Sequence, residues 1–282
     1  MWKKILQRLI SGLIILIIIS FIVYSLIHVI PGDPVASMFG KMPDPELMAR
    51  IKHDLGLDRP VYLQYLTWLW NILNGNLGYS VRAGAPVSKL ISQRLPATVS
   101  LVVVSMVISL SISIPIGIIS ATKPHSFRDY VGVTLSLIGI STPMFWLGII
   151  FILVFSMYLK IFPSATYVPI LQDPIDSLHH LFLPGASLGV ILAGTVIRIT
   201  RSSMLEVLSE EYIKFATLKG LTRKIVVIKH ALKNALIPVI TIVAIQMGYV
   251  LGGTVPIEVV FAWPGIVSLL LNALEWRDYP LI

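Results

Sequence analysis

Residues 211–239 read EYIKFATLKGLTRKIVVIKHALKNALIPV and lie between two segments that are apolar enough to cross a membrane. The stretch favours helix on both sides of Gly220, and from Arg198 to Lys233 the chain has eight basic residues against three acidic ones. Cytoplasmic loops of membrane proteins carry such an excess of lysine and arginine. The pattern therefore predicts a polytopic membrane protein whose most basic connector faces the cytoplasm.

The composition agrees with a membrane protein. The 282 residues are 56% hydrophobic and 13% charged, with a mean hydropathy of +0.85 and a formal net charge of +8. About 20 apolar residues are needed to cross roughly 30 Å of hydrocarbon. The sequence therefore predicts an all-α, polytopic transmembrane helix bundle. Five spans are expected, near residues 9–30, 95–122, 130–159, 178–197 and 234–257.

Lysine and arginine also predict the orientation. Lys3, Lys4 and Arg8 precede the first apolar run. No small-residue cleavage site follows that run, which is typical of an uncleaved anchor. By the positive-inside rule, the N-terminus, the connector at 121–129 and the segment 198–233 are cytoplasmic.

We expect one transmembrane domain over residues 1–282. Its parts are a first span (1–30), an extracytoplasmic cap (31–94), core spans (95–258) with cytoplasmic helices near 203–233, and an extracytoplasmic segment (259–282). The cap is predicted to hold one helix that begins at Asp44-Pro45-Glu46 and an aromatic helix over Pro60–Leu73, at the membrane interface or against the spans. The last segment is too short and too interrupted by Trp263-Pro264-Gly265 to cross the bilayer.

The opening stretch predicts two helices joined by a tight turn. Glu206–Leu218 can form one helix, Gly220 ends it, and residues from Lys224 form a second helix that continues into the fifth span. On the cytoplasmic side such a unit would protrude from the bilayer as a rigid element. A plain solvated loop would not need two helical halves joined by a glycine.

Residues 185–189, GASLG, fit the G-x-S-x-G pattern of serine hydrolases. That pattern needs a strand, a sharp turn and a helix, whereas these residues lie within a predicted span. Gly185, Gly189 and Ala193 are spaced by four, which favours close packing of helices. Packing is the favoured interpretation, and an intramembrane serine hydrolase that uses Ser187 is the alternative from another class.

The residue types also bear on other chemistries. The absence of cysteine excludes disulfides and cysteine-based metal sites. His179 and His180 are neighbours that point about 100° apart on a helix, so they need a further ligand to bind one ion, and no metal site is predicted. No G-x-x-x-x-G-K-[ST] phosphate loop is present, so the chain is not expected to hydrolyse ATP. A proton-coupled carrier is disfavoured because no acidic residue falls within a predicted span.

Residues 211–239 resemble the EAA loop of ABC-importer permeases, in the dipeptide/oligopeptide/nickel branch. The branch pattern is E-Y-x-x-x-A-x-x-K-G-L followed by H-A-L-x-N-A-x-x-P. The matching residues are Glu211, Tyr212, Ala216, Lys219, Gly220, Leu221, His230, Ala231, Leu232, Asn234, Ala235 and Pro238. In the general motif Glu-Ala-Ala precedes the glycine by six, five and four residues. Lys214, Phe215 and Ala216 hold those positions here, so of the three only the last alanine matches.

Other stretches resemble the same branch along nearly the whole chain. They are HVIPGDP from residue 28, LGLDRPVYLQY from 55, LGYS from 77, LPATVSL from 95, STPMFWLG from 141, RITRSSMLE from 198, FAWPGI from 261 and RDYP from 277. With this resemblance we assign a second set of residues to the translocation path or its packing: Ser141, Pro143, Trp146, Gly185, Ser187, Gly189 and Gly252.

The resemblance implies a non-enzymatic permease subunit in the cytoplasmic (inner) membrane of a bacterium or archaeon. Its partners would be a second homologous permease, two ATP-binding subunits that hold ATP and Mg, and an extracytoplasmic substrate-binding protein, with no nucleic acid. The substrate would be a di- or oligopeptide, with nickel or a metal chelate as the alternative.

In such a complex residues 211–239 would hold the coupling helix, seated in a cleft of the ATPase. The residues expected to couple are Glu211, Tyr212, Ala216, Lys219, Gly220, Leu221, His230 and Asn234. Relatives continue past the R-D-Y-P stretch into a sixth span that returns the C-terminus to the cytoplasm. We therefore expect a sixth span that is missing from this sequence.

Overall fold

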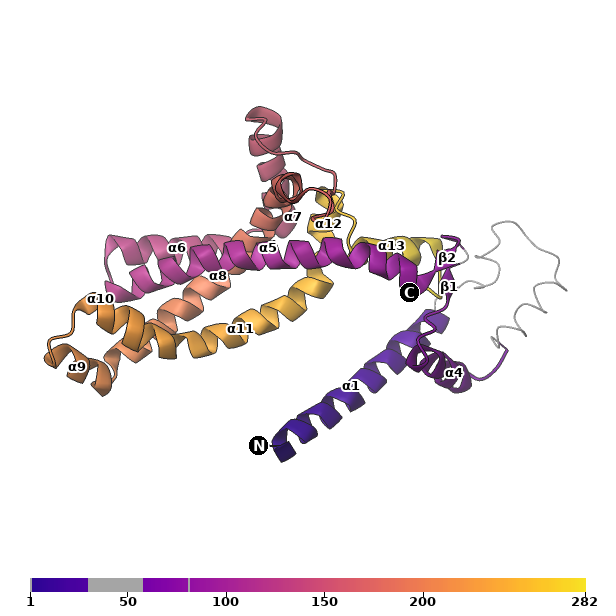
Figure 1. Ribbon diagram of the computed structural model, residues 1–282, viewed down its shortest axis with the longest axis horizontal. Coiled ribbons are helices and arrows are strands. Elements are labelled where there is room, and N and C mark those ends of the chain that lie inside the picture. The colour runs from indigo at the N-terminus through magenta and orange to yellow at the C-terminus, as the bar shows by residue number, and fades with distance from the viewer. Residues whose placement is uncertain (1, 30–57, 81) are drawn as a thin grey trace. The chain divides into compact units, whose positions relative to one another are not determined.

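The computed structural model describes residues 2–29, 58–80 and 82–282 (Figure 1). The chain forms two compact units, one made of Met1–Gln93 with Leu270–Ile282 and the other of Arg94–Leu269. The cap helix predicted at Asp44-Pro45-Glu46 lies outside the described residues.

Two helices and a small hairpin are the main elements in the described part of the first unit. Helix α1 (Trp2–Val29) is a continuous apolar helix, and α4 (Val61–Leu73) forms where the aromatic helix was predicted. Tyr65 of α4 is buried against α1: its ring lies edge-on to Phe21 with 5.1 Å between centroids, and its hydroxyl is 2.8 Å from that of Ser20. The aromatic residues therefore fix α4 against the first span.

The hairpin joins the C-terminal segment. Strands β1 (Tyr79–Ser80) and β2 (Ala85–Pro86) pair antiparallel, with Tyr79 opposite Pro86. The Ser80 hydroxyl donates a hydrogen bond to the Asp278 carboxylate. The hairpin therefore anchors the end of the chain within this unit.

All regular secondary structure of the second unit is helical. Its elements are α5 (Val87–Thr122) and α13 (Ile266–Trp276), both shared with the first unit, and α6 (Phe127–Ser141), α7 (Met144–Phe151), the π-helix η1 (Ile152–Tyr158), α8 (Pro174–Ser209), α9 (Glu211–Leu218), α10 (Arg223–Ile225), the π-helix η2 (Val226–Ala231), α11 (Leu232–Gly253) and α12 (Val255–Val260).

Helix α8 is the centre of the second unit. It packs against both α6 and α11 (Figure 1). In its apolar 18-residue stretch 72% is buried, whereas the corresponding stretch of α5 is 33% buried. Leu181, Leu183 and Leu188 of α8 form the main core with residues of α5, α11 and α12. The remaining helices are therefore organised around α8.

Glycines let α8 approach its neighbours closely. A β-carbon on Gly189 would lie 2.8 Å from the Ser105 carbonyl oxygen of α5, and one on Gly194 would lie 2.7 Å from the Ser136 carbonyl oxygen of α6. On α5, a β-carbon at Gly117 would lie 2.6 Å from Cβ of Thr200. Backbones in contact at these distances leave little freedom for one helix to slide past another.

The segment predicted as the third span, 130–159, is a broken helix. Helix α6 and the α7–η1 pair meet at an angle of 104°. The bend follows from local sequence, because Pro143 pushes the preceding Thr142 into extended backbone (φ −80°, ψ 126°) and has no N–H for the helix. Among the described residues, four helices are long and apolar enough to span a membrane, or five if this pair counts as one. The predicted all-α membrane bundle is thus confirmed.

The prediction of one helix over Glu206–Leu218 is wrong. Helix α8 continues to Ser209, and Glu210 interrupts it with extended backbone (φ −65°, ψ 147°) before α9 begins. With 36 residues, α8 is about 54 Å long. That length exceeds a hydrocarbon core of roughly 30 Å, so an end of α8 projects beyond it.

The segment after α11 forms two short helices, α12 and α13. Glu258 of α12 is 1% exposed and accepts hydrogen bonds from the Thr254 hydroxyl and the Ser268 N–H, both at 2.7 Å. Trp263 is buried and its indole N–H donates to the Ala97 carbonyl at 2.8 Å. This hydrogen bond holds the Trp-Pro-Gly stretch against α5.

Adding one methyl group at the close contact between α8 and α5 should destabilise the protein. In Gly189→Ala the new β-carbon meets a backbone oxygen that cannot rotate away, so we expect a loss of about 1–3 kcal/mol. Thermal unfolding in detergent measures it, with Gly248→Ala as control because nothing lies within 4 Å of that position. Equal midpoints for both variants would contradict the packing described above.

Candidate functional site

The basic stretch forms a compact unit, here called the knob, which consists of residues 211–231. Its inner face is apolar: Ala216 and Val227, among others, pack on Ala121 near the end of α5 and on Met204 near the end of α8. This second core is separate from the main core around Leu181. The knob is therefore attached to the projecting end of α8 as a rigid part and not as a loop.

A single glycine makes the turn of the knob. Gly220 has φ +79°, as a helix stop requires, and nothing lies within 4 Å of where its β-carbon would be. The N–H of Lys219 donates to the Phe215 carbonyl and that of Gly220 to the Thr217 carbonyl, each at 3.0 Å. The constraint at Gly220 is therefore backbone conformation and not space.

The two halves of the motif meet in space. The Asn234 amide donates to the Tyr212 hydroxyl at 2.7 Å, and this hydroxyl lies 3.5 Å from the His230 carbonyl oxygen. Tyr212 begins the knob, whereas His230 and Asn234 lie at its end and in α11. The predicted coupling residues Tyr212, His230 and Asn234 thus close the knob into one unit.

The outer face of the knob combines apolar and basic side chains. Phe215 is 62% exposed and Leu218 is 83% exposed, one turn apart on α9. Lys214, Lys219 and Lys224 are exposed around them. Exposed apolar side chains with a charged rim are typical of a protein-binding surface.

Of the other predicted coupling residues, one is exposed to solvent and two face the second core. Glu211 is exposed in the first turn of α9, where a carboxylate interacts favourably with the helix dipole. Ala216 and Leu221 face inward onto the second core. Ala216 therefore supports the knob from within and does not contribute to its outer face.

The residues predicted for the path are not gathered in one place. Ser141 ends α6, Pro143 precedes α7, and Trp146 and Gly252 are exposed on α7 and α11. Gly185, Ser187 and Gly189 are buried in α8. Their assignment to a translocation path stays a prediction.

The surroundings of Ser187 do not suit a nucleophile. Its side chain is fully buried and its hydroxyl donates to the Leu183 carbonyl of the same helix at 2.8 Å. The G-x-S-x-G residues lie in the middle of α8, without the preceding strand and sharp turn that expose a catalytic serine. The hydrolase alternative therefore has no structural support.

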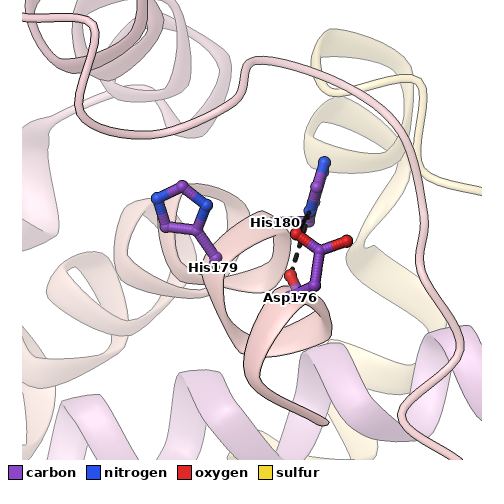
Figure 2. A group of neighbouring side chains, drawn as sticks. All are labelled: Asp176, His179 and His180. Carbon is purple, nitrogen blue, oxygen red and sulfur yellow. Dashed lines mark hydrogen bonds and ion pairs between the residues drawn. The ribbon is translucent and has the colours of Figure 1, made fainter. Parts of the chain in front are cut away.

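Asp176, His179 and His180 lie together near the start of α8 (Figure 2). Their possible ligand atoms are within 4.8 Å of one another, so Asp176 provides the third group that the sequence analysis lacked. The two rings, however, point in different directions (Figure 2), with 87° between their planes. Nε2 of His179 is 2.7 Å from the Ile161 carbonyl oxygen, and Nδ1 of His180 is 3.4 Å from the Asp176 carboxylate. The group holds the preceding connector against α8.

Sequence reasoning missed an ion pair beside the knob. Asp129 in the first turn of α6 has a side chain that is 4% exposed, and Arg201 of α8 binds it in bidentate fashion at 2.5 and 2.7 Å. The only local signal was the Ser126-x-x-Asp129 helix start, in which Ser126 caps α6. Nothing in the sequence paired Asp129 with a residue 72 positions away.

Comparison with known proteins places the chain in a family. Residues 113–282 match the family model described as "Binding-protein-dependent transport system inner membrane component", and residues 1–102 match the model of its N-terminal part. The chain belongs to this family. The resemblance to binding-protein-dependent importer permeases is thereby confirmed.

Individual relatives match along the whole chain. The dipeptide transport system permease protein DppB of Escherichia coli K12 is 38% identical, over 100% of this chain and 90% of its own. A putative peptide transport system permease protein of Brucella suis is also 38% identical with the same coverage. DppB of Alkalihalophilus pseudofirmus is 37% identical, over 98% of this chain and 89% of its own.

Replacing Ser187 by alanine separates the packing role from the hydrolase alternative. Because the hydroxyl bonds only within its own helix, we expect Ser187→Ala to change stability by about 1 kcal/mol or less and to leave transport intact. Uptake by membrane vesicles and thermal unfolding measure both effects. Complete loss of uptake by a folded Ser187→Ala protein would restore the hypothesis that Ser187 is a nucleophile.

Proposed function

We propose that this chain is the permease subunit of an ATP-driven importer of di- or oligopeptides, and that the knob is the surface on which an ATPase subunit docks. The observation that carries the proposal is the knob itself, a rigid helical unit with Phe215 and Leu218 exposed inside a basic rim. The names of the relatives, which refer to dipeptide and peptide transport, support the substrate class over nickel.

The proposed complex has this chain and a second homologous permease in the membrane, two ATP-binding subunits below it and a substrate-binding protein outside. ATP and Mg are held by the ATP-binding subunits, because this sequence has no phosphate-binding loop. The N-terminus and the knob face the cytoplasm, as the distribution of lysine and arginine favours.

Force on the knob would reach the spans by rigid packing. Ala216 and Val227 contact the ends of α5 and α8 through the second core, and α8 is the most buried helix of its unit. When the ATPase subunits close on ATP, they would displace the knob together with the end of α8. Close-packed helices respond to such a displacement by rigid-body movement, which supports alternating access of the path.

Truncating the exposed aromatic ring should weaken docking. We expect Phe215→Ala to lower the affinity for the ATPase subunits by about 2 kcal/mol or more, roughly 30-fold, because aromatic anchors dominate protein interfaces. Co-purification of tagged permease with its partners in mild detergent measures this. Leu171→Ala is the control, since Leu171 is 96% exposed in the connector before α8, away from the knob. Unchanged recovery of the ATPase subunits with Phe215→Ala would overturn the docking role.

A bulky residue at the turn should uncouple the importer. Valine at position 220 would have to adopt φ +79°, which costs a branched side chain about 1–2 kcal/mol or more. We expect Gly220→Val to abolish uptake while the chain stays in the membrane. Gly220→Asn is the matched control, because asparagine tolerates the left-handed region. Normal uptake by Gly220→Val would refute the coupling role.

A further inference from the structure

We propose that the connector between α5 and α6 is a second coupling element, which links the knob to α8 through the hydrogen bond of Arg223 with Thr122 and the ion pair of Asp129 with Arg201. The inference rests on the proposed function of the knob. It assigns a positioning role to Asp129, Arg201 and Arg223, all of which lie within the second unit.

The first step of the link joins the knob to α5. Arg223, in the first turn after Gly220, donates its guanidinium N–H to the backbone carbonyl of Thr122, the last residue of α5. A carbonyl at a helix end has no partner within its helix and is therefore free to accept this bond. Displacement of the knob would thus act directly on the start of the connector.

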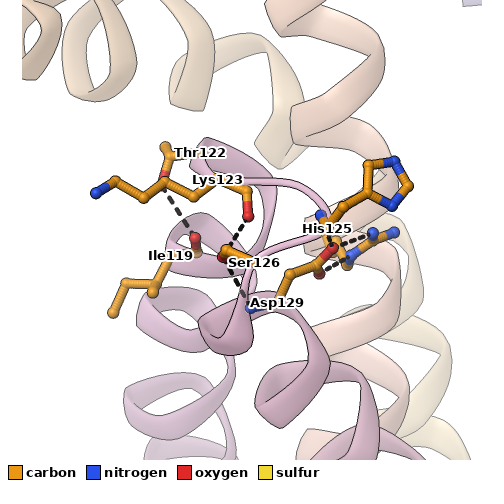
Figure 3. Close-up of polar contacts among 7 residues, drawn as sticks. Ile119, Thr122, Lys123, His125, Ser126 and Asp129 are labelled. Atoms are coloured by element: carbon orange, nitrogen blue, oxygen red, sulfur yellow. Dashed lines mark hydrogen bonds and ion pairs between the residues drawn. The ribbon is translucent and has the colours of Figure 1, made fainter.

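The second step is a connector with one defined shape. His125 has φ +60°, an unusual value for a residue with a side chain, and its backbone N–H donates to the Asp129 carboxylate at 3.0 Å (Figure 3). The Ser126 hydroxyl donates to the Lys123 carbonyl at 2.6 Å (Figure 3). Residues 123–126 are therefore held as a tight turn by the side chain of Asp129, and a shift at Thr122 is carried to α6.

The third step is the ion pair itself, in which the Asp129 side chain is 4% exposed and the Arg201 side chain is 26% exposed. Arg201 presents a planar fork to both carboxylate oxygens, which fixes distance and direction together. Arg201 lies one turn before Met204, which belongs to the core under the knob. The knob is therefore connected to the same short region of α8 in two ways. One is apolar packing on Met204, and the other is the connector through Arg201.

The ion pair is not needed merely to hold α6 and α8 together. Closely packed glycines already hold the three helices together: a β-carbon on Gly132 of α6 would overlap the Ser120 hydroxyl of α5, and one on Gly139 would lie 3.1 Å from Gly194 of α8. Ion pairs add little net stability, whether they are exposed to solvent or buried. The fixed direction of the contact between Asp129 and Arg201 is suited to transmitting a movement from α6 to α8, whereas stabilising the helix contact would not require it.

The test uses the assembled importer in proteoliposomes, with its ATPase subunits and its binding protein. Uptake of a dipeptide and ATP hydrolysis are measured together, and their ratio is the readout, because a loss of protein alone does not change it. We expect Asp129→Asn and Arg223→Gln each to lower the ratio about 2- to 30-fold, the effect of coupling residues outside the binding sites. Arg128→Gln and Arg198→Gln are the controls, since both side chains are exposed neighbours of the ion pair.

Combined variants decide whether the contacts act in series. If they do, Asp129→Asn with Arg223→Gln lowers the ratio no further than the more severe single change, whereas independent effects that multiply would overturn the proposal. Arg223→Gln leaves the ion pair of Asp129 with Arg201 intact, so a wild-type ratio in this variant also overturns the link, even if Asp129→Asn fails to assemble.

Failure of this inference can be told apart from failure of the proposed function. If Phe215→Ala and Gly220→Val leave docking and uptake unchanged, the knob has no coupling role and the proposed function fails. If those two variants lose uptake while Asp129→Asn and Arg223→Gln keep the wild-type ratio, the knob acts alone and only the second link is wrong.

Discussion

Close contact between α8 and its neighbours is the constraint on which the second unit depends. A membrane gives helices no hydrophobic drive to associate, so they must pack well or bond across their interface. Gly189 and Gly194 bring α8 against the backbones of α5 and α6, where even one β-carbon would collide. This packing makes α5, α6 and α8 a single close-packed unit. Such a unit can transmit a displacement from one end of the helices to the other.

The knob uses the same principle outside the apolar core. Its short helices could not be stable alone, because a helix of eight residues is too short to persist in water. The second core under Ala216 and the bond between Asn234 and Tyr212 provide the missing stability. Phe215 and Leu218 can then stay exposed for a partner, since they are not needed to hold the fold together.

Charge has two different roles in this chain. Exposed lysines on the knob set its electrostatic character and the expected orientation in the membrane. In the pair of Asp129 and Arg201 the carboxylate is instead buried and bound by both arms of the guanidinium, so the pair fixes direction and spacing. Position within the fold, and not residue type, decides which role a charged side chain takes.

The sequence by itself determined the helical membrane class, the knob with its turn at Gly220 and the family, because apolar length, glycine conformation and motif spacing are local properties. It did not determine the break of α8 at Glu210, since helix limits depend on competing contacts. The bend at Thr142 was not predicted either, although its cause, Pro143, is local. Only the tertiary structure decided that Ser187 is buried and bonded within its helix, and that Asp129 meets Arg201. The physical reason is that such contacts join residues of different helices, or depend on the neighbours that cover a residue, and no local pattern encodes either.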